Sequence, residues 1–440
     1  MTSDRMFSRI CARFGWRSLV WGAVLAVLAL TLDFLPLVDV LGFDFCFVMG
    51  LAAAVAGVDV GHGTVRAARR GAVNGGPATV VLRAILGGLV LLAVPLVVSL
   101  ANAFRVRNCN IGAGVVFFLL LPVATMVYAA GTGAAMAIAI PRPRLGRVLA
   151  FGLPLVSVAW ALWRLYRDPA VFAFDPYAGY FPGPIYDEAL RPPLPLLLFR
   201  LANLTWLAAV VALLQVLCHD PIRPLQMVFR PARALALPLW RPLVALGLLV
   251  ASALWLVNAE RLGFHSTHAL LANILPRETR SQHFVLRTDP TVDSDDDIAL
   301  VEQDLEFRYF QLAQTLGIEP ALPITVYRFP SAAAKKEAVG AATTLFAKPW
   351  TREIFVQADR FPAQRLRHEM AHVFASGFGD RFFGVSFAWH FWGPVPIPRL
   401  DRTCRRECVP RADPWPLGAD QRHRTCRVRR TGRRRSLRRP

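Results

Sequence analysis

The stretch AILGGLVLLAVPLVVSLANAF, residues 84 to 104, decides the fold class of this chain. It contains 21 residues and no charged side chain, and a helix needs about 20 mostly apolar residues to cross the roughly 30 Å hydrocarbon core of a bilayer. Six other stretches have similar length and polarity: residues 19–40, 43–61, 111–140, 146–164, 193–217 and 239–258. The sequence therefore predicts an α-helical multi-span membrane domain of about seven helices in residues 1–258.

The overall composition agrees with a membrane protein and argues against a nucleic-acid partner. Hydrophobic residues make up 55% of the 440 residues, and the mean hydropathy is +0.40. The formal net charge is +20, but residues 399–440 hold 15 arginines against 4 acidic residues and so contribute +11 of it. No nucleic-acid-binding motif accompanies this charge. The seven cysteines are too scattered for a disulfide framework.

The loop arginines predict how the spans are threaded, because arginine-rich loops stay in the cytoplasm. Four arginines between residues 5 and 17 place the N-terminus inside, and seven spans then place everything after residue 258 outside. The first apolar run lacks a small-residue cleavage site, so we expect it to be retained as a span. We expect a multi-pass protein of a bacterial inner membrane with an extracytoplasmic water-soluble part. Asp33 and Asp59 fall near predicted span ends, which favours interfacial positions over an ion path.

A small α+β domain is expected in residues 283–398, after a linker at 259–282. Apolar side chains recur at helical spacing from Ile298 to Leu316, after acidic residues suited to a helix start and before Gly317 as a stop. The residues from 331 to 341 are helix-prone. Three segments are strand-like: HFVLRTDP (283–290), LPITVYRF (322–329) and REIFVQA (352–358).

The segment RLRHEMAHVFA, residues 365 to 375, carries the chemistry. His368 and His372 are four residues apart, so a helix presents them on one face, one turn apart. Two imidazoles so placed can bind one Zn²⁺ at about 2.0 to 2.1 Å, with Glu369 beside them. Zinc lowers the pKa of its water toward about 7, and the carboxylate accepts the proton and passes it to the leaving amine. The pattern predicts peptide hydrolysis, and its alternative is a surface helix with solvated histidines.

The segment LRHEMAH, preceded by a β-rich strand, an acidic-started helix and ITVYRF, resembles the gluzincin zinc metallopeptidases, in particular the peptidase MA-like domains attached to membrane proteins. The resemblance covers residues 283–378. It implies that His368 and His372 are zinc ligands, that Glu369 is the general base, and that a glutamate on a later helix is the third ligand. The one glutamate after Glu369 is Glu407, which the resemblance therefore makes the third metal ligand.

The segment around Glu407 departs from the family pattern. Family members continue with a GLxEGxA kind of helix, whereas TCRRECVPRADPW (403–415) contains Pro410, which breaks a helix, and arginines that repel a cation. Asp401, in PIPRLDR, is an alternative third ligand, similar to the LDG motif of site-two intramembrane proteases. Arg365 and Arg367 argue for water around the motif and against a membrane span.

The C-terminal residues 399–440 have no hydrophobic period and an extreme arginine content, so we expect them to be disordered or the product of a frameshift. His390, in FFGVSFAWHFWGPVPIP (382–398), is interpreted as an interfacial or packed histidine and not as a ligand. A weak alternative is a zinc knuckle formed by Cys404, Cys408, His423 and Cys426.

Together these patterns predict a membrane-anchored, zinc-dependent peptidase that acts on a peptide or protein near the bilayer, and that is incomplete or inactive if the third ligand is lost. Two alternatives remain open. One is a non-enzymatic membrane scaffold or transport-related protein whose peptidase-like domain has decayed into a binding module. The other is a site-two-like intramembrane protease.

Overall fold

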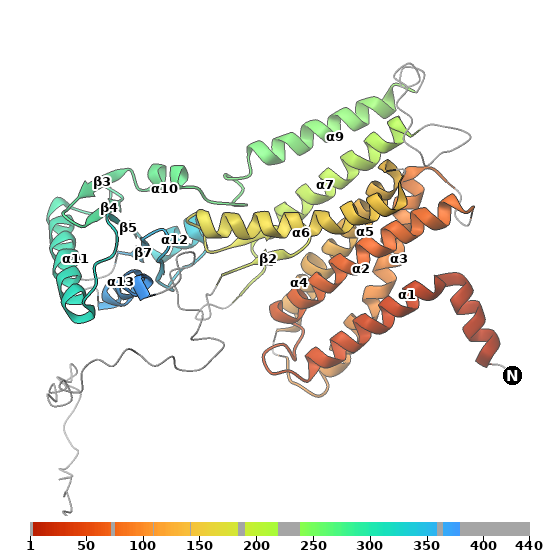
Figure 1. Ribbon diagram of the computed structural model, residues 1–440, viewed down its shortest axis with the longest axis horizontal. Coiled ribbons are helices and arrows are strands. Elements are labelled where there is room, and N and C mark those ends of the chain that lie inside the picture. Colours follow the sequence, from red (N-terminus) through yellow and green to blue (C-terminus); the bar gives the residue numbers. More distant parts are fainter. Residues whose placement is uncertain are drawn as a thin grey trace, which may run out of the picture. The chain divides into compact units, whose positions relative to one another are not determined.

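The computed structural model describes residues 3–71, 75–108, 110–140, 142–183, 190–218, 238–358 and 364–378. Side chains are described from Trp16 onward, and in the last range from Leu366. Most of this part of the chain is helical, with a small sheet region toward its C-terminal end (Figure 1). The predicted basic tail at 399–440 lies outside the described residues.

Seven helices among the described residues are long and apolar enough to cross a membrane, which confirms the expected number of spans. The fourth is a continuous run of α4, the π-helical turn η1 and α5; the π turn contains Pro122, which has no N–H for the ordinary helical hydrogen bond. The helices are α1 (Ser3–Asp33), α2 (Phe43–Arg69), α3 (Pro77–Asn102), α4 (Ile111–Phe118), η1 (Leu119–Val123), α5 (Ala124–Ala139), α6 (Pro143–Arg167), α7 (Leu194–Leu217) and α9 (Trp240–Val257).

Helix α2 continues past the predicted span at 43–61 to Arg69, and its polar residues find partners on neighbouring helices. Asp59 is buried and accepts hydrogen bonds from Arg17 Nη2 at 2.8 Å and Trp21 Nε1 at 3.1 Å, both on α1. A buried carboxylate paired in this way does not end an apolar helix. Asp33 is also buried and is the last residue of α1, so it lies at a helix end as expected.

A short β-hairpin occupies part of the loop between α6 and α7. Strands β1 (Ala173–Asp175) and β2 (Gly179–Phe181) pair antiparallel. The turn is held by Asp175, whose Oδ1 accepts hydrogen bonds from the backbone N–H groups of Tyr177 at 2.8 Å and Ala178 at 2.7 Å. This local bonding is the usual way in which aspartate stabilises a turn.

The sheet region contains a five-stranded mixed sheet in the order β3-β4-β5-β7-β6. The three central strands β4, β5 and β7 run parallel, and both edge strands are antiparallel to their neighbours. The elements are α10 (His268–Ile274), β3 (Arg277–Arg280), β4 (Phe284–Thr288), α11 (Asp295–Leu316), β5 (Ile324–Phe329), α12 (Ala332–Val339), β6 (Phe346–Lys348), β7 (Glu353–Gln357), α13 (Gln364–Ala375) and η2 (Ser376–Phe378).

Side chains alternate between the two faces of the central strands, and each face has its own helical cover. On β5, Val326 belongs to a core shared with α11 and α13, whereas Tyr327 belongs to a core shared with α10 and α12. Period-two alternation of this kind is what buries both faces of a sheet between helices. Helix α13 therefore lies on the same side of the sheet as α11 (Figure 1).

The predicted helix and strands in this region are present, and the structure adds elements that were not expected. Helix α11 begins with Ser294, whose hydroxyl accepts from Asp297 N at 3.1 Å, and ends at Gly317 with φ of 66°. The segment 259–282, expected to be a linker, contains α10 and β3, and β3 pairs with β4 in register Thr279 with Leu286.

The sheet region is fastened to the end of α6 by hydrogen bonds. Lys348 of β6 is buried, and its Nζ donates to the carbonyl oxygens of Leu165, Asp168 and Ala170 at 2.9, 2.5 and 2.7 Å. Trp350 Nε1 donates to Tyr166 O at 2.8 Å, and the two rings stack with centroids 5.5 Å apart. Lysine caps helix carbonyls in this way because its three N–H groups can serve three acceptors.

Candidate metal site

Helix α13 holds the HEMAH segment on the surface of the sheet region. Its side chains at Leu366, Met370, Val373 and Phe374 are buried in the core shared with α11. Spacings of four, three and one residues put these side chains on one helical face. The histidines of the motif therefore lie on the opposite, exposed face.

His368 and His372 converge. Their Nε2 atoms are 3.2 Å apart, the ring centroids are 4.8 Å apart, and the rings are perpendicular. Two nitrogens bound tetrahedrally to one zinc at about 2.0–2.1 Å lie about 3.3 Å from each other. The observed separation therefore fits two ligands of a common Zn²⁺. Burial, and then the neighbouring His368, lower the pKa of His372, which favours the neutral imidazole that a metal requires.

Glu369 is buried between the helix and the rest of the sheet region. Burial raises the pKa of its carboxyl, while His368 and then Lys335 act to lower it. When ionised, a carboxylate whose pKa lies above its ordinary value accepts a proton more readily than a solvated carboxylate does. The site thus combines two exposed imidazoles with a largely desolvated carboxyl on the next residue.

Lys335, on α12, is a neighbour of the site that the sequence reasoning missed. Its side chain is fully buried, and Nζ donates to Thr344 O at 2.8 Å. The chain has only three lysines among its 50 basic residues, at 335, 336 and 348, and two of them are buried. Lysine is rarely buried without a specific partner. The three lysines close together in a chain otherwise rich in arginine were therefore the sequence feature that could have pointed to Lys335.

The remaining predicted site residues lie outside the described residues. These are Glu407, Asp401, His390, Cys404, Cys408, His423 and Cys426. In the ranges that the structure does describe, no group of three or more His, Cys, Asp or Glu side chains is placed to hold a metal ion. The described residues of the site therefore bring together two imidazoles and one carboxyl group, without a third side chain placed to hold a metal ion.

Strand β6 lies beside the site at the border of the sheet. Within the described residues it pairs with β7 alone, in the register Ala347 with Ile354, and it contacts α13. An edge strand presents unpaired backbone N–H and C=O groups to which an extended peptide can bind. The two histidines lie on α13, and the open edge of the sheet is β6, which contacts that helix.

Comparison with known proteins gives no relative: no protein-family model, curated protein or solved structure matches the chain. What the site does must therefore be argued from its own residues.

Proposed function

We propose that the chain is a membrane-anchored, zinc-dependent peptidase of gluzincin type. His368 and His372 hold the metal, Glu369 is the general base, and Glu407 supplies the third ligand. One observation carries the proposal: the two Nε2 atoms lie 3.2 Å apart on an exposed helical face, with a buried glutamate next to His368. At this distance one imidazole can donate a hydrogen bond to the other, and a zinc ion between the two nitrogens would need little movement of the rings.

The chemistry divides between the metal and the chain. Zn²⁺, when bound, supplies a Lewis acid that polarises the scissile carbonyl and lowers the pKa of the attacking water. One carboxylate oxygen of Glu369 accepts the proton that the water loses. The same carboxyl group later delivers this proton to the nitrogen of the leaving amine. Its burial suits it to both steps, because a desolvated carboxylate binds a proton more strongly than a solvated one.

The substrate class is a peptide or protein segment in extended form. Support comes from strand β6, whose edge beside α13 offers main-chain hydrogen bonds to an added strand. The seven apolar helices would keep this site close to a bilayer, and the loop arginines favour an extracytoplasmic position at a bacterial inner membrane. We therefore expect a substrate near the membrane surface.

A decayed, non-enzymatic binding module is the second candidate. It is favoured by the fact that the described residues contribute two metal ligands and no third. An intramembrane protease has less support, because α13 is a 12-residue helix packed on the sheet region and is not among the seven apolar helices.

The test uses the full chain, purified and reconstituted in bilayer nanodiscs. We expect close to one zinc per chain by elemental analysis and chelator-sensitive cleavage of a peptide library. Glu369→Gln should keep the zinc and abolish cleavage, whereas His368→Ala should lose the metal. Arg367→Gln, an exposed change on the same helix, is the matched control and should alter neither.

The outcomes separate the candidates. Zinc binding without cleavage in the unmodified chain would support the binding module. A chain that binds no zinc, or a Glu369→Gln variant that cleaves at the original rate, would refute the proposed function.

A further inference from the structure

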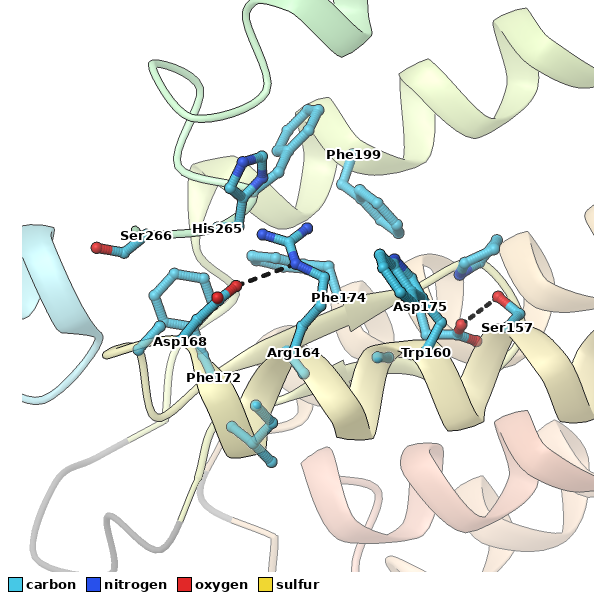
Figure 2. Close-up of a pocket in the computed structure, with 16 residues that line it drawn as sticks. Ser157, Trp160, Arg164, Asp168, Phe172, Phe174, Asp175, Phe199, His265 and Ser266 are labelled. Carbon is cyan, nitrogen blue, oxygen red and sulfur yellow. Dashed lines mark hydrogen bonds and ion pairs between the residues drawn. The ribbon is translucent and has the colours of Figure 1, made fainter. Parts of the chain in front are cut away.

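A cavity of about 200 Å³ lies at the C-terminal end of α6, where the chain turns into the hairpin of β1 and β2 (Figure 2). Its walls come from the last turns of α6, the following segment with β1, Phe199 of α7, and residues 264–266 after α9. Complete small-molecule sites usually have about 300–1,000 Å³. This cavity is therefore of a size to take a small group and not a whole cofactor.

Aromatic rings form much of the wall. Phe174 contacts Phe172, Phe199 and Phe264, with ring centroids 5.5, 5.3 and 6.4 Å away. Their faces are electron-rich and attract a cation that lies over them.

Four ionisable side chains line the cavity: Arg164, Asp168, Asp175 and His265. Arg164 Nε donates to Asp168 Oδ2 at 3.1 Å, and this ion pair leaves the two terminal nitrogens of the guanidinium out of the contact (Figure 2). His265 lies nearby; burial, and then Arg164, lower the pKa of its imidazole, which favours the neutral form. Asp175 also lines the cavity, but its oxygens are occupied by Ser157 and the β-hairpin turn.

The charged groups of the wall are therefore one guanidinium, the Asp168 carboxylate paired with it, and the Asp175 carboxylate, whose oxygens already accept hydrogen bonds. A purely anionic ligand would be repelled by Asp168, and a purely cationic one by Arg164. A small zwitterion whose two charges are a few ångströms apart satisfies both, with its anion on the guanidinium and its cation on the carboxylate and the rings.

The side chains around the end of α6 are those expected where a span leaves the bilayer. Trp160 lines it and is 63% exposed, and the nearby α6 residues Leu155, Val156 and Leu162 are also exposed, as expected of a lipid-facing surface. At the same helix end Trp163 stacks on Tyr166, with centroids 6.0 Å apart. Tryptophan and tyrosine collect at the height of the lipid headgroups, which is where a zwitterionic group is abundant.

We propose that this cavity binds the phosphoethanolamine headgroup of a membrane phospholipid, with the phosphate on Arg164 and the ammonium between Asp168 and the phenylalanine rings. The acyl chains then lie along the exposed apolar face of α6. This inference is independent of the zinc chemistry proposed for α13.

A ligand in the cavity would also affect how the sheet region is attached to α6. Leu165, Asp168 and Ala170 line the cavity, and their carbonyl oxygens are the three acceptors of Lys348 Nζ. A headgroup held by Arg164 and Asp168 therefore contacts the turn whose carbonyl oxygens bind Lys348 of β6. Lipid binding would order the attachment of the sheet region to span α6.

The experiment measures which lipid the full chain retains. The protein is reconstituted in nanodiscs with equal parts of phosphatidylethanolamine, phosphatidylglycerol and phosphatidylcholine, extracted in mild detergent and examined by native mass spectrometry. We expect preferential retention of phosphatidylethanolamine. Arg164→Leu should reduce that retention about tenfold, as expected for loss of a charge-assisted hydrogen bond. Arg167→Leu, an exposed change on the same helical turn that lies outside the cavity, should leave it unchanged.

Two further arms make the result decisive. Asp168→Asn keeps the shape of the cavity and should shift retention toward anionic phosphatidylglycerol. If Arg164→Leu fails to fold, Phe199→Ala replaces it as the variant that should reduce retention of phosphatidylethanolamine. Soluble phosphoethanolamine and inorganic phosphate, added as competitors at millimolar concentration, should not displace the lipid. Equal retention of the three lipids, an unchanged Asp168→Asn preference, or displacement by either soluble competitor would overturn the proposal.

Discussion

A close approach between helices α2 and α5 gives a prediction whose size can be worked from the structure. A Cβ atom added at Gly61 of α2 would lie 2.2 Å from the carbonyl oxygen of Ala130 and 2.7 Å from the backbone nitrogen of Ala134, both on α5. Even a favourable C–H···O contact keeps carbon and oxygen about 3.3 Å apart. Gly61→Ala therefore requires the two helices to separate by about 1 Å.

Gly63, two residues further along the same helix, is the matched control, because an added Cβ there meets nothing within 4 Å. Both substitutions gain about 1 kcal/mol of helix propensity, so this contribution cancels in the comparison. Overpacking typically costs about 1–3 kcal/mol, and a clash with backbone atoms cannot be relieved by side-chain rotation. We expect Gly61→Ala to be about 2–3 kcal/mol less stable than Gly63→Ala.

The assay is unfolding in mixed micelles with increasing SDS, followed by tryptophan fluorescence on the full chain. Gly133→Ala supplies an independent check from the α5 side, because its Cβ would lie 2.7 Å from Val58 O, and it should behave like Gly61→Ala. Equal stabilities for Gly61→Ala and Gly63→Ala would mean that α2 and α5 do not meet along this face.

One further prediction concerns the attachment of the sheet region to α6, and another concerns a hydrogen bond within the sheet region. Lys348→Met removes three donors from the end of α6, so amide exchange at Val171, whose N–H bonds to the sheet region, should become at least about tenfold faster; Lys336→Met, an exposed change, should not alter it. The hydrogen bond of His268 Nε2 to Glu353 at 2.7 Å raises the pKa of the imidazole above 6.5. Its stabilisation is complete below pH 6.5 and is lost as pH rises through the folded-state pKa. Because His268 is half exposed, we expect this hydrogen bond to stabilise the folded state by less than about 1 kcal/mol. The measurement is the fall in unfolding midpoint between pH 6 and pH 8, which His268→Gln should remove. An unchanged pH dependence in that variant would contradict the assignment.

Local patterns were sufficient wherever a few neighbouring residues determine the outcome. The seven apolar runs gave seven helices, although α2 extends to Arg69, beyond the predicted end at residue 61. The helix ending at Gly317 was predicted from apolar spacing and its stop signal, and both are local. A pairing across 42 residues, such as Arg17 with Asp59, leaves no local trace in the sequence.

The candidate site shows the same division. Spacing alone put His368 and His372 on one helical face, whereas their convergence to 3.2 Å and the burial of Glu369 required the packing of α13 on the sheet. Lys335 could not be connected with Glu369 from the sequence, because 34 residues separate them and nothing periodic joins them.

By itself the sequence determined what depends on composition and short spacing: apolar runs long enough for a bilayer, helix starts and stops, and two histidines one turn apart. Only the tertiary structure decided the order of the five strands, the contribution of α10 and β3 from the supposed linker, the hold of Lys348 on α6, and the aromatic cavity beside it. The physical reason is range. Helix formation and membrane insertion are governed by residues within a few turns of one another, whereas strand pairing, burial of charge and cavities are fixed by contacts between segments far apart in the chain.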